Sequence, residues 1–215
     1  MGNEAYQKSY DGASTNIQIS SLFLTRRLAR VVSAQQEKLE SGATVRIDST
    51  VSAAVMHQPS DSTLLWDAVR VMTRLLRRAG RLPEAPAMRW RDRRRLAKKR
   101  ARAIDYSRGK AKKRVLYRQL IAAVQATRAE LQTVAEGLSE TIGMAAERWR
   151  AGVDHYLPLI ARIIDQSERR VLKGEAVPAG EKLVSLFEPH ADIIVKGGRE
   201  VQYGHKLNLA TGRSA

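Results

Sequence analysis

An aspartate stands in the middle of the stretch TVRIDSTV, at 44–51, which otherwise consists mostly of β-branched residues. Such residues favour an extended strand, and aspartate is depleted in strands. On these residues alone, Asp48 is best explained as a strand-end acid whose carboxylate caps a turn with Ser49 or Thr50. Whether Asp48 has a catalytic role depends on which other functional groups lie close to it in the folded chain.

The placement of the net charge of +16 identifies a second group of candidate residues. Residues 70–118 contain 20 Lys and Arg against three acids, a net +17, whereas the rest of the chain holds 18 bases and 19 acids, a net −1. A dense basic segment is typical of a polyanion partner, because each neutralised phosphate releases counterions. Nucleic acid is therefore favoured over anionic lipid, an acidic protein or a solvated basic helix without a partner.

The densest part of this segment is RWRDRRRLAKKRARAIDYS, at 89–107. It has helix-forming composition but almost no apolar face, so we expect phosphates, and not packing, to hold it. The candidate DNA-binding residues are Arg91, Arg93, Arg94, Arg95, Lys98, Lys99, Arg100 and Arg102. Trp90 and Tyr106 flank the segment, but an aromatic residue on a helix is more often a packing residue than one that stacks on bases.

The composition restricts the remaining chemistry. The chain has no cysteine, which excludes disulfides and thiolate metal sites and fits a reducing cytoplasm. Its four histidines share no metal-ligand spacing. No apolar run approaches the roughly 18 residues of a membrane span, and residues 1–16 lack the apolar centre of a signal peptide. We therefore expect a cytoplasmic protein without a membrane partner.

Helical periodicity and caps place the elements around these residues. Helices are predicted from Ser20 or Ser21 to Gly42, and from the cap residue Ser60 to Gly80. Asp61 lies in the first turn of the second helix, and Asp67 is expected on its surface. Pro83 and Pro86 mark a linker.

Beyond Gly109, two long amphipathic helices are predicted to pack as an antiparallel hairpin, with Pro158 as a kink. Their apolar residues are Leu116, Leu120, Val124, Leu131, Val134, Leu138, Trp149, Val153, Tyr156, Ile160 and Ile164.

After residue 180 the composition changes to that of strands. KLVSLF, DIIVK and EVQYGHKLNL are predicted strands, and KGGR, at 196–199, is a predicted hairpin turn. A lone early strand, a long helical part and a late group of strands suggest one sheet that is interrupted by a helical insertion.

Two extended blocks, RIDSTVSAAVMHQPSDSTLLWDAVRVMTRLL at 46–76 and EKLVSLFEPHADIIVKGGREVQYGHKLNLATGRS at 181–214, carry a family resemblance. Together with the helical insert between them, they resemble transposases of bacterial insertion sequences, of the ISNCY group, with a DDE catalytic domain. The resemblance spans roughly residues 20–215. It implies an RNase H-like fold in a bacterial cytoplasmic protein.

In this family three acids are expected to hold two Mg²⁺ ions for in-line displacement at phosphorus. The resemblance implies that Asp48, in RIDST, is the first catalytic and metal-binding acid. The second acid is expected after the YGHK segment, in a stretch resembling NPAD, and the third is a glutamate on a later helix. The chain ends at Ala215, before both positions. Because one carboxylate binds Mg²⁺ weakly, we expect the isolated chain neither to nick nor to join DNA. Lys206, in YGHK, is expected to touch a DNA phosphate near the catalytic edge.

The sequence thus predicts a mostly helical α/β protein, an incomplete RNase H-like mixed sheet interrupted by a basic helical insertion. The predicted domains are a frayed segment at 1–19, the first part of a catalytic domain at 20–80, the insertion at 81–180 and returning strands at 181–215. The favoured function is that of a DNA transposase fragment, inactive alone. The alternatives are a non-catalytic nucleic-acid-binding protein and a helical module that binds an acidic protein. Whether the chain forms a homo-oligomer stays open.

Overall fold

The computed structural model describes residues 45–82, 85, 89–195 and 200–212. The helix predicted between Ser20 and Gly42, and the KGGR turn, lie outside the described residues. The chain divides into two compact units, Met1–Thr50 with Asn208–Ala215, and Val51–Leu207. Every described helix belongs to the second unit.

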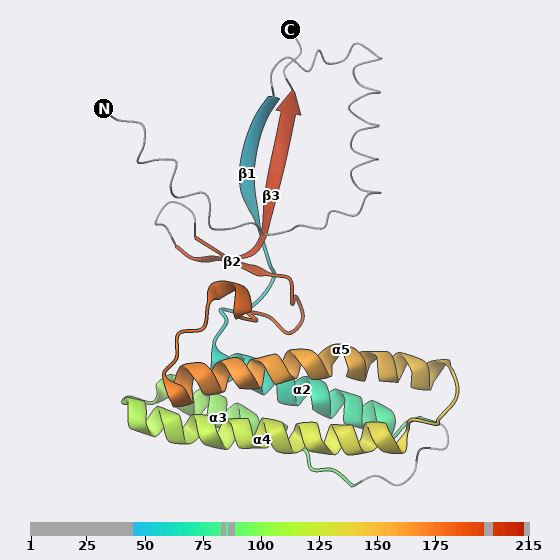
Figure 1. Cartoon of the computed structure of the whole chain (residues 1–215). Coiled ribbons are helices and arrows are strands. Elements are labelled where there is room, and N and C mark those ends of the chain that lie inside the picture. Colours follow the sequence, from blue (N-terminus) through green and yellow to red (C-terminus); the bar gives the residue numbers. More distant parts are fainter. Residues whose placement is uncertain (1–44, 83–84, 86–88, 196–199, 213–215) are drawn as a thin grey trace, which may run out of the picture. The chain divides into compact units, whose positions relative to one another are not determined.

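Three strands form one sheet: β1 (Val45–Ala53), β2 (Asp192–Ile194) and β3 (Gln202–Gly212). The strand order is β1-β3-β2, and β2 runs antiparallel to β3 with Asp192 opposite Gly204 (Figure 1). Beyond the end of β1, the Ala54 N–H still donates to the Tyr203 carbonyl, at 2.9 Å. The predictions that Asp48 lies on a strand, and that this strand pairs with the last part of the chain, are confirmed.

One of the predicted late strands is wrong. DIIVK supplies β2 and EVQYGHKLNL supplies β3, but KLVSLF, at 182–187, is irregular backbone. Leu183, Val184 and Leu186 are nevertheless buried. The backbone of Leu183 pairs with the side-chain amide of Gln166, which donates to its carbonyl at 3.2 Å and accepts from its N–H at 2.8 Å. A side chain therefore supplies the partners that a neighbouring strand would otherwise give.

Helix α2 (Asp61–Ala79) begins and ends where the sequence predicts. The Ser60 hydroxyl accepts from the Thr63 N–H, and Gly80 follows the last turn. The helix packs against three others, and most of its residues are buried. Asp67, predicted as a surface acid, is only 2% exposed, and it pairs with Arg70 at 2.6 Å and faces His57 at 3.6 Å. The prediction for Asp67 is therefore wrong, because its carboxylate is buried and paired.

Helix α3 (Arg94–Tyr106) is packed, contrary to the expectation that nothing internal holds it. It contacts α2 and α4, and its buried residues are Ala97, Ala101 and Ile104. Spacings of four and three residues place these side chains on one helical face. Because two of these residues are small alanines, this face packs closely on its neighbours with Ile104 as its one large apolar residue.

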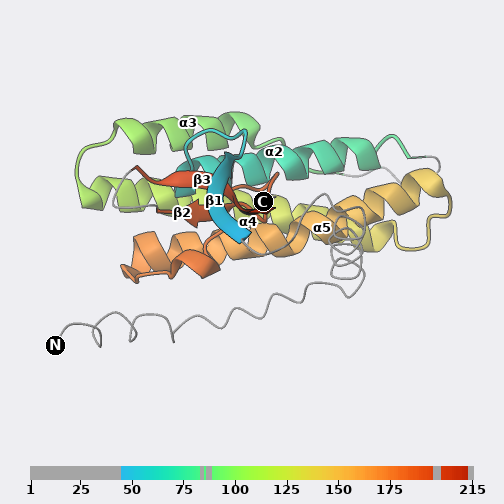
Figure 2. The same ribbon diagram turned by 90° about the horizontal axis from the view of Figure 1, so that it is seen from above.

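Two long helices follow, α4 (Lys110–Gly137) and α5 (Met144–Ser167). They run antiparallel, as predicted, and α5 continues through Pro158 (Figures 1 and 2). Each contacts α2 more extensively than it contacts the other, so α2 is central to the packing. The Trp149 indole N–H donates to the Leu75 carbonyl at 2.8 Å and ties α5 to α2. The short helices η1 (Glu168–Lys173) and η2 (Ala179–Glu181) then lead towards β2.

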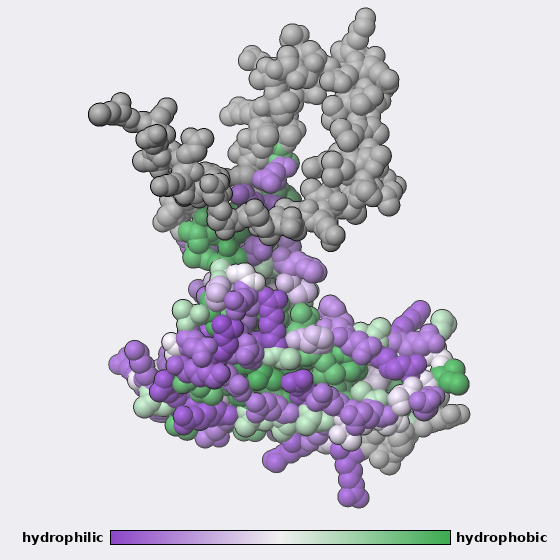
Figure 3. Space-filling model, viewed as in Figure 1, coloured by the Kyte–Doolittle hydropathy of each residue, from purple (hydrophilic) through white to green (hydrophobic). Residues whose placement is uncertain are grey.

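The described chain is thus mostly helical with a small sheet, which agrees with the predicted α/β class. Among the described strands there is no parallel pair, so the mixed sheet of the prediction is not seen. Hydrophilic side chains cover much of the visible face of the helical part (Figure 3). No helix in the described ranges combines the length and the apolar character needed to cross a membrane.

Candidate nucleic-acid interface

The outward side of α3 is a basic ridge, formed by Arg95, Lys99, Arg102 and Tyr106. At about 100° per residue, these positions fall on the side of the helix opposite the buried Ala97, Ala101 and Ile104. All four side chains are exposed, Tyr106 at 86%. Within the described part of the chain, none of the three cations of the ridge forms an ion pair. The ridge therefore presents uncompensated positive charge and one aromatic ring to solvent.

Two of the predicted DNA-binding residues form ion pairs within the described chain. Arg93 pairs with Glu130 of α4 at 2.6 Å, with both side chains mostly covered. Arg94 donates to both carboxylate oxygens of Asp92, at 2.8–3.1 Å, and Arg77 reaches the same carboxylate at 3.1 Å. The hydrogen bond from Arg94 lowers the pKa of Asp92 to about 2. These cations are already engaged, so Arg93 in particular is a weak candidate for phosphate contact.

The remaining predicted residues differ in their surroundings. Arg91 is exposed just before α3, and its backbone N–H donates to Glu130. Arg100 is half-buried, and its Nε finds no partner among the described atoms. Lys206 is exposed on β3, whereas the elements that contact α3 are α2 and α4. The structure therefore does not bring Lys206 into the ridge.

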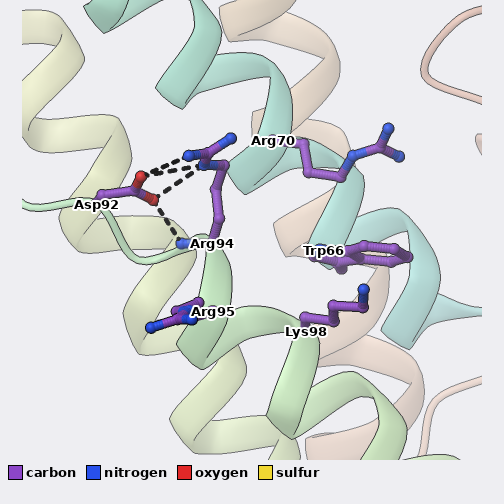
Figure 4. A pocket seen from close by; sticks show the side chains of 6 residues that line it. All are labelled: Trp66, Arg70, Asp92, Arg94, Arg95 and Lys98. Carbon is purple, nitrogen blue, oxygen red and sulfur yellow. Dashed lines mark hydrogen bonds and ion pairs between the residues drawn. The ribbon is translucent and has the colours of Figure 1, made fainter.

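A hollow of about 480 Å³ lies beside the ridge, between α2 and α3 (Figure 4). Its lining consists of Trp66, Arg70, Asp92, Arg94, Arg95 and Lys98. The Arg70 guanidinium lies 5.0 Å from the centre of the Trp66 ring, and the Lys98 ammonium lies 5.7 Å from it. Figure 4 shows these cations on opposite sides of the indole plane. Four cations against one acid give the hollow a net positive charge.

Trp66 is the residue that the sequence analysis missed. The signal was available, because Trp66 and Arg70 are one helical turn apart and such pairs lie side by side on a helix. The approach of Lys98 from α3 was not available, since it depends on how two helices pack. Trp90, by contrast, is partly buried against the core, so the packing interpretation is the one that fits it.

Asp48 lies in β1, as expected, but a metal centre around it is not formed by described residues. In the described part of the chain, no three His, Cys, Asp or Glu side chains gather in a way that could hold a metal ion. These residues alone do not fit a two-Mg²⁺ centre, and no reaction step through Mg²⁺ follows from them.

No family model, curated protein or solved structure matches the chain. The basic ridge, the hollow and the sheet are therefore the observations on which a function can be argued.

Proposed function

We propose that this chain binds DNA through the outward ridge of α3. The observation that supports the proposal most directly is that α3 has one buried apolar face and one exposed basic face. Its alanine face packs in the core, while Arg95, Lys99 and Arg102 project outward without acidic partners among the described residues. Because α3 is packed, its backbone needs no ordering on binding, and three cations on one side of it suit the regular charges of a nucleic-acid backbone. Contacts of this kind give affinity with little sequence selectivity.

The test is a titration of a fluorescein-labelled duplex followed by anisotropy. Lys99→Gln with Arg102→Gln removes two ridge charges, and Lys112→Gln with Arg118→Gln removes two exposed charges from α4 as a control. We expect the ridge pair to weaken binding about tenfold and the control pair much less, because only the ridge cations are held in one row. Equal effects of the two pairs, or no binding by the wild type at low salt, would contradict the proposal.

We further propose that the DNA-binding chain is part of a DDE-type transposase with an RNase H-like fold, and that Asp48 is its first metal-binding acid. The family resemblance of residues 46–76 and 181–214 motivates this. The pairing of β1 with β3 supports it, because a divided sheet must bring the strand of Asp48 against the late strands. In such a protein Asp48 would be one of three acids that together hold the metal ions.

This second proposal is tested on the gene and then on its product. A reading frame beyond codon 215 should encode an NPAD-like stretch and a later glutamate. The protein that contains them should cleave a supercoiled plasmid with Mg²⁺, and Asp48→Asn should abolish cleavage without changing DNA affinity. Cleavage that survives Asp48→Asn would overturn the transposase proposal and leave DNA binding by α3 intact.

A further inference from the structure

We propose that the hollow between α2 and α3 is a phosphate-binding site in which Trp66 is a positioning residue for two cations. The inference rests on the proposed DNA binding and extends it, because it assigns a second, differently built contact beside the ridge. Its ligand is a phosphate group, carried either by a DNA strand or by a free phosphate compound.

The indole of Trp66 fixes the cations of the hollow. Arg70 and Lys98 lie over opposite faces of the ring, at 5.0 and 5.7 Å from its centre. Both faces are therefore occupied, so the ring is not free to stack on a base. Cation–π attraction instead holds the two charges at one place. Arg70 is fixed from a second direction, because it donates to the buried carboxylate of Asp67 at 2.6 Å.

The net positive charge of the residues that line the hollow favours an anion as the ligand. The lining contains the cations Arg70, Arg94, Arg95 and Lys98 and one carboxylate, that of Asp92, a net +3, and Arg70 is also paired with Asp67 outside the lining. That carboxylate already accepts hydrogen bonds from Arg94 and Arg77. Within the described chain, Lys98 and Arg95 have no acidic partner, so they are the cations free to bind a ligand. The volume of about 480 Å³ falls in the range of small-ligand sites and leaves room for the sugar attached to a phosphate.

Two adjacent lysines give a matched comparison. Lys98 lines the hollow, whereas Lys99 lies on the ridge, and each carries one charge on α3. We expect inorganic pyrophosphate to change the tryptophan emission of the wild type and of Lys99→Gln in a saturable way. Lys98→Gln should lose this change, and Trp66→Phe should lose it because the reporting indole is gone. A response of Lys98→Gln equal to that of Lys99→Gln would overturn the proposal.

The positioning role of Trp66 is tested by the affinity for duplex DNA. Trp66→Phe keeps an aromatic face for the cations and should bind within about twofold of the wild type, whereas Trp66→Leu should bind about fivefold more weakly. Thermal melting of both variants checks that they fold alike. If Trp66→Leu binds as well as Trp66→Phe, the positioning role is wrong.

The outcomes separate this inference from the proposed function. Emission changes caused by DNA and by pyrophosphate assign the site to backbone phosphate, and a change caused by pyrophosphate alone assigns it to a free phosphate compound. If neither ligand changes the emission while Lys99→Gln with Arg102→Gln still weakens DNA binding, the hollow is not a phosphate site and the ridge proposal stands. If the ridge pair also has no effect, both fail.

Discussion

Asp61 is a buried acid with one ionic partner in the described chain, Arg170. It is 7% exposed at the start of α2, and its oxygens accept from Arg170 at 2.9 and 3.0 Å and from Gln166 at 3.4 Å. Burial raises the pKa of Asp61 above its ordinary 3.8, although Arg170 opposes the shift. Desolvation therefore outweighs the attraction of the ion pair. Substituting Arg170 and substituting Asp61 should then change the stability of the protein by very different amounts.

We predict that Arg170→Ala destabilises the protein by about 3 kcal/mol at pH 7, because it strands a buried carboxylate. Asp61→Asn should cost less than about 1 kcal/mol, since it leaves only the 40% exposed side chain of Arg170 unpaired.

A carboxyl group whose pKa is raised in the folded state stabilises the fold most below its unfolded pKa, and that contribution is lost as the pH rises through the folded pKa. The deficit of Arg170→Ala should therefore be smaller at pH 4 than at pH 7. Urea unfolding at both pH values measures this, and equal costs for the two variants would contradict it.

Asp92 is the one acid among the described residues that line the proposed phosphate site, so its negative charge should weaken the binding of an anion there. Its carboxylate accepts the Arg94 N–H at 3.0 Å, at the start of α3, and it pairs with Arg77 and Arg94. The substitution Asp92→Asn keeps an acceptor for that N–H while it removes one negative charge. We predict that this variant binds duplex DNA about threefold more tightly at low salt, with the gain fading at high salt. Anisotropy titrations at two salt concentrations test this, and weaker binding at low salt would count against an anion site.

At the scale of elements, α3 depends on small residues. Ala97 and Ala101 are 0% and 3% exposed where α3 meets α2 and α4. We predict that Ala101→Leu destabilises the protein by about 2 kcal/mol, because added methylenes overpack a filled contact. The same change at Ala122, which is exposed on α4, should have an effect within about 0.5 kcal/mol. Chemical denaturation compares the two variants, and similar values would mean that α3 is loosely packed.

The pairing of β1 with β3 depends on Gly204. A Cβ at this position would lie on the Ser52 carbonyl oxygen and at 2.9 Å from the Ala54 backbone nitrogen, both of which are backbone atoms that cannot rotate away. We predict that Gly204→Ala lowers the unfolding free energy by about 2 kcal/mol or more, through disruption of the sheet. Hydrogen exchange should show a larger acceleration at the Ala54 amide than at the helical amides. An unaltered Ala54 amide would contradict this close approach.

The elements that the sequence predicts well are those whose signals are local. The hydroxyl of Ser60 and the glycine at position 80 define the ends of α2, and β-branched residues define β1. The strand predicted for KLVSLF and the lack of core packing predicted for α3 are wrong for tertiary reasons. KLVSLF is buried beneath a glutamine that satisfies its backbone, and α3 packs through alanines. Likewise, the basic residues were found from composition, but their division into ridge, hollow and ion pairs depends on contacts with α2 and α4.

At the scale of the whole molecule, the concentration of positive charge in one segment allows a quantitative prediction. Residues 70–118 hold a net +17 and the rest a net −1, so the proposed DNA binding should depend steeply on salt. Each phosphate contact contributes about 0.9 to the slope of log affinity against log salt. Lys99→Gln with Arg102→Gln should therefore reduce the slope by about 1.8, whereas Lys112→Gln with Arg118→Gln should leave it nearly unchanged.

The slope distinguishes contact from general attraction, which affinity at one salt concentration does not. If the chain attracts DNA only through its overall charge, removing any two exposed cations changes the slope equally, and α3 has no special role. If α3 is the contact surface, the two pairs differ although both variants have a net charge of +14 in place of +16. Isothermal titrations between about 50 and 200 mM salt measure both slopes directly. Their equality would refute α3 as the interface, even if each variant bound DNA more weakly.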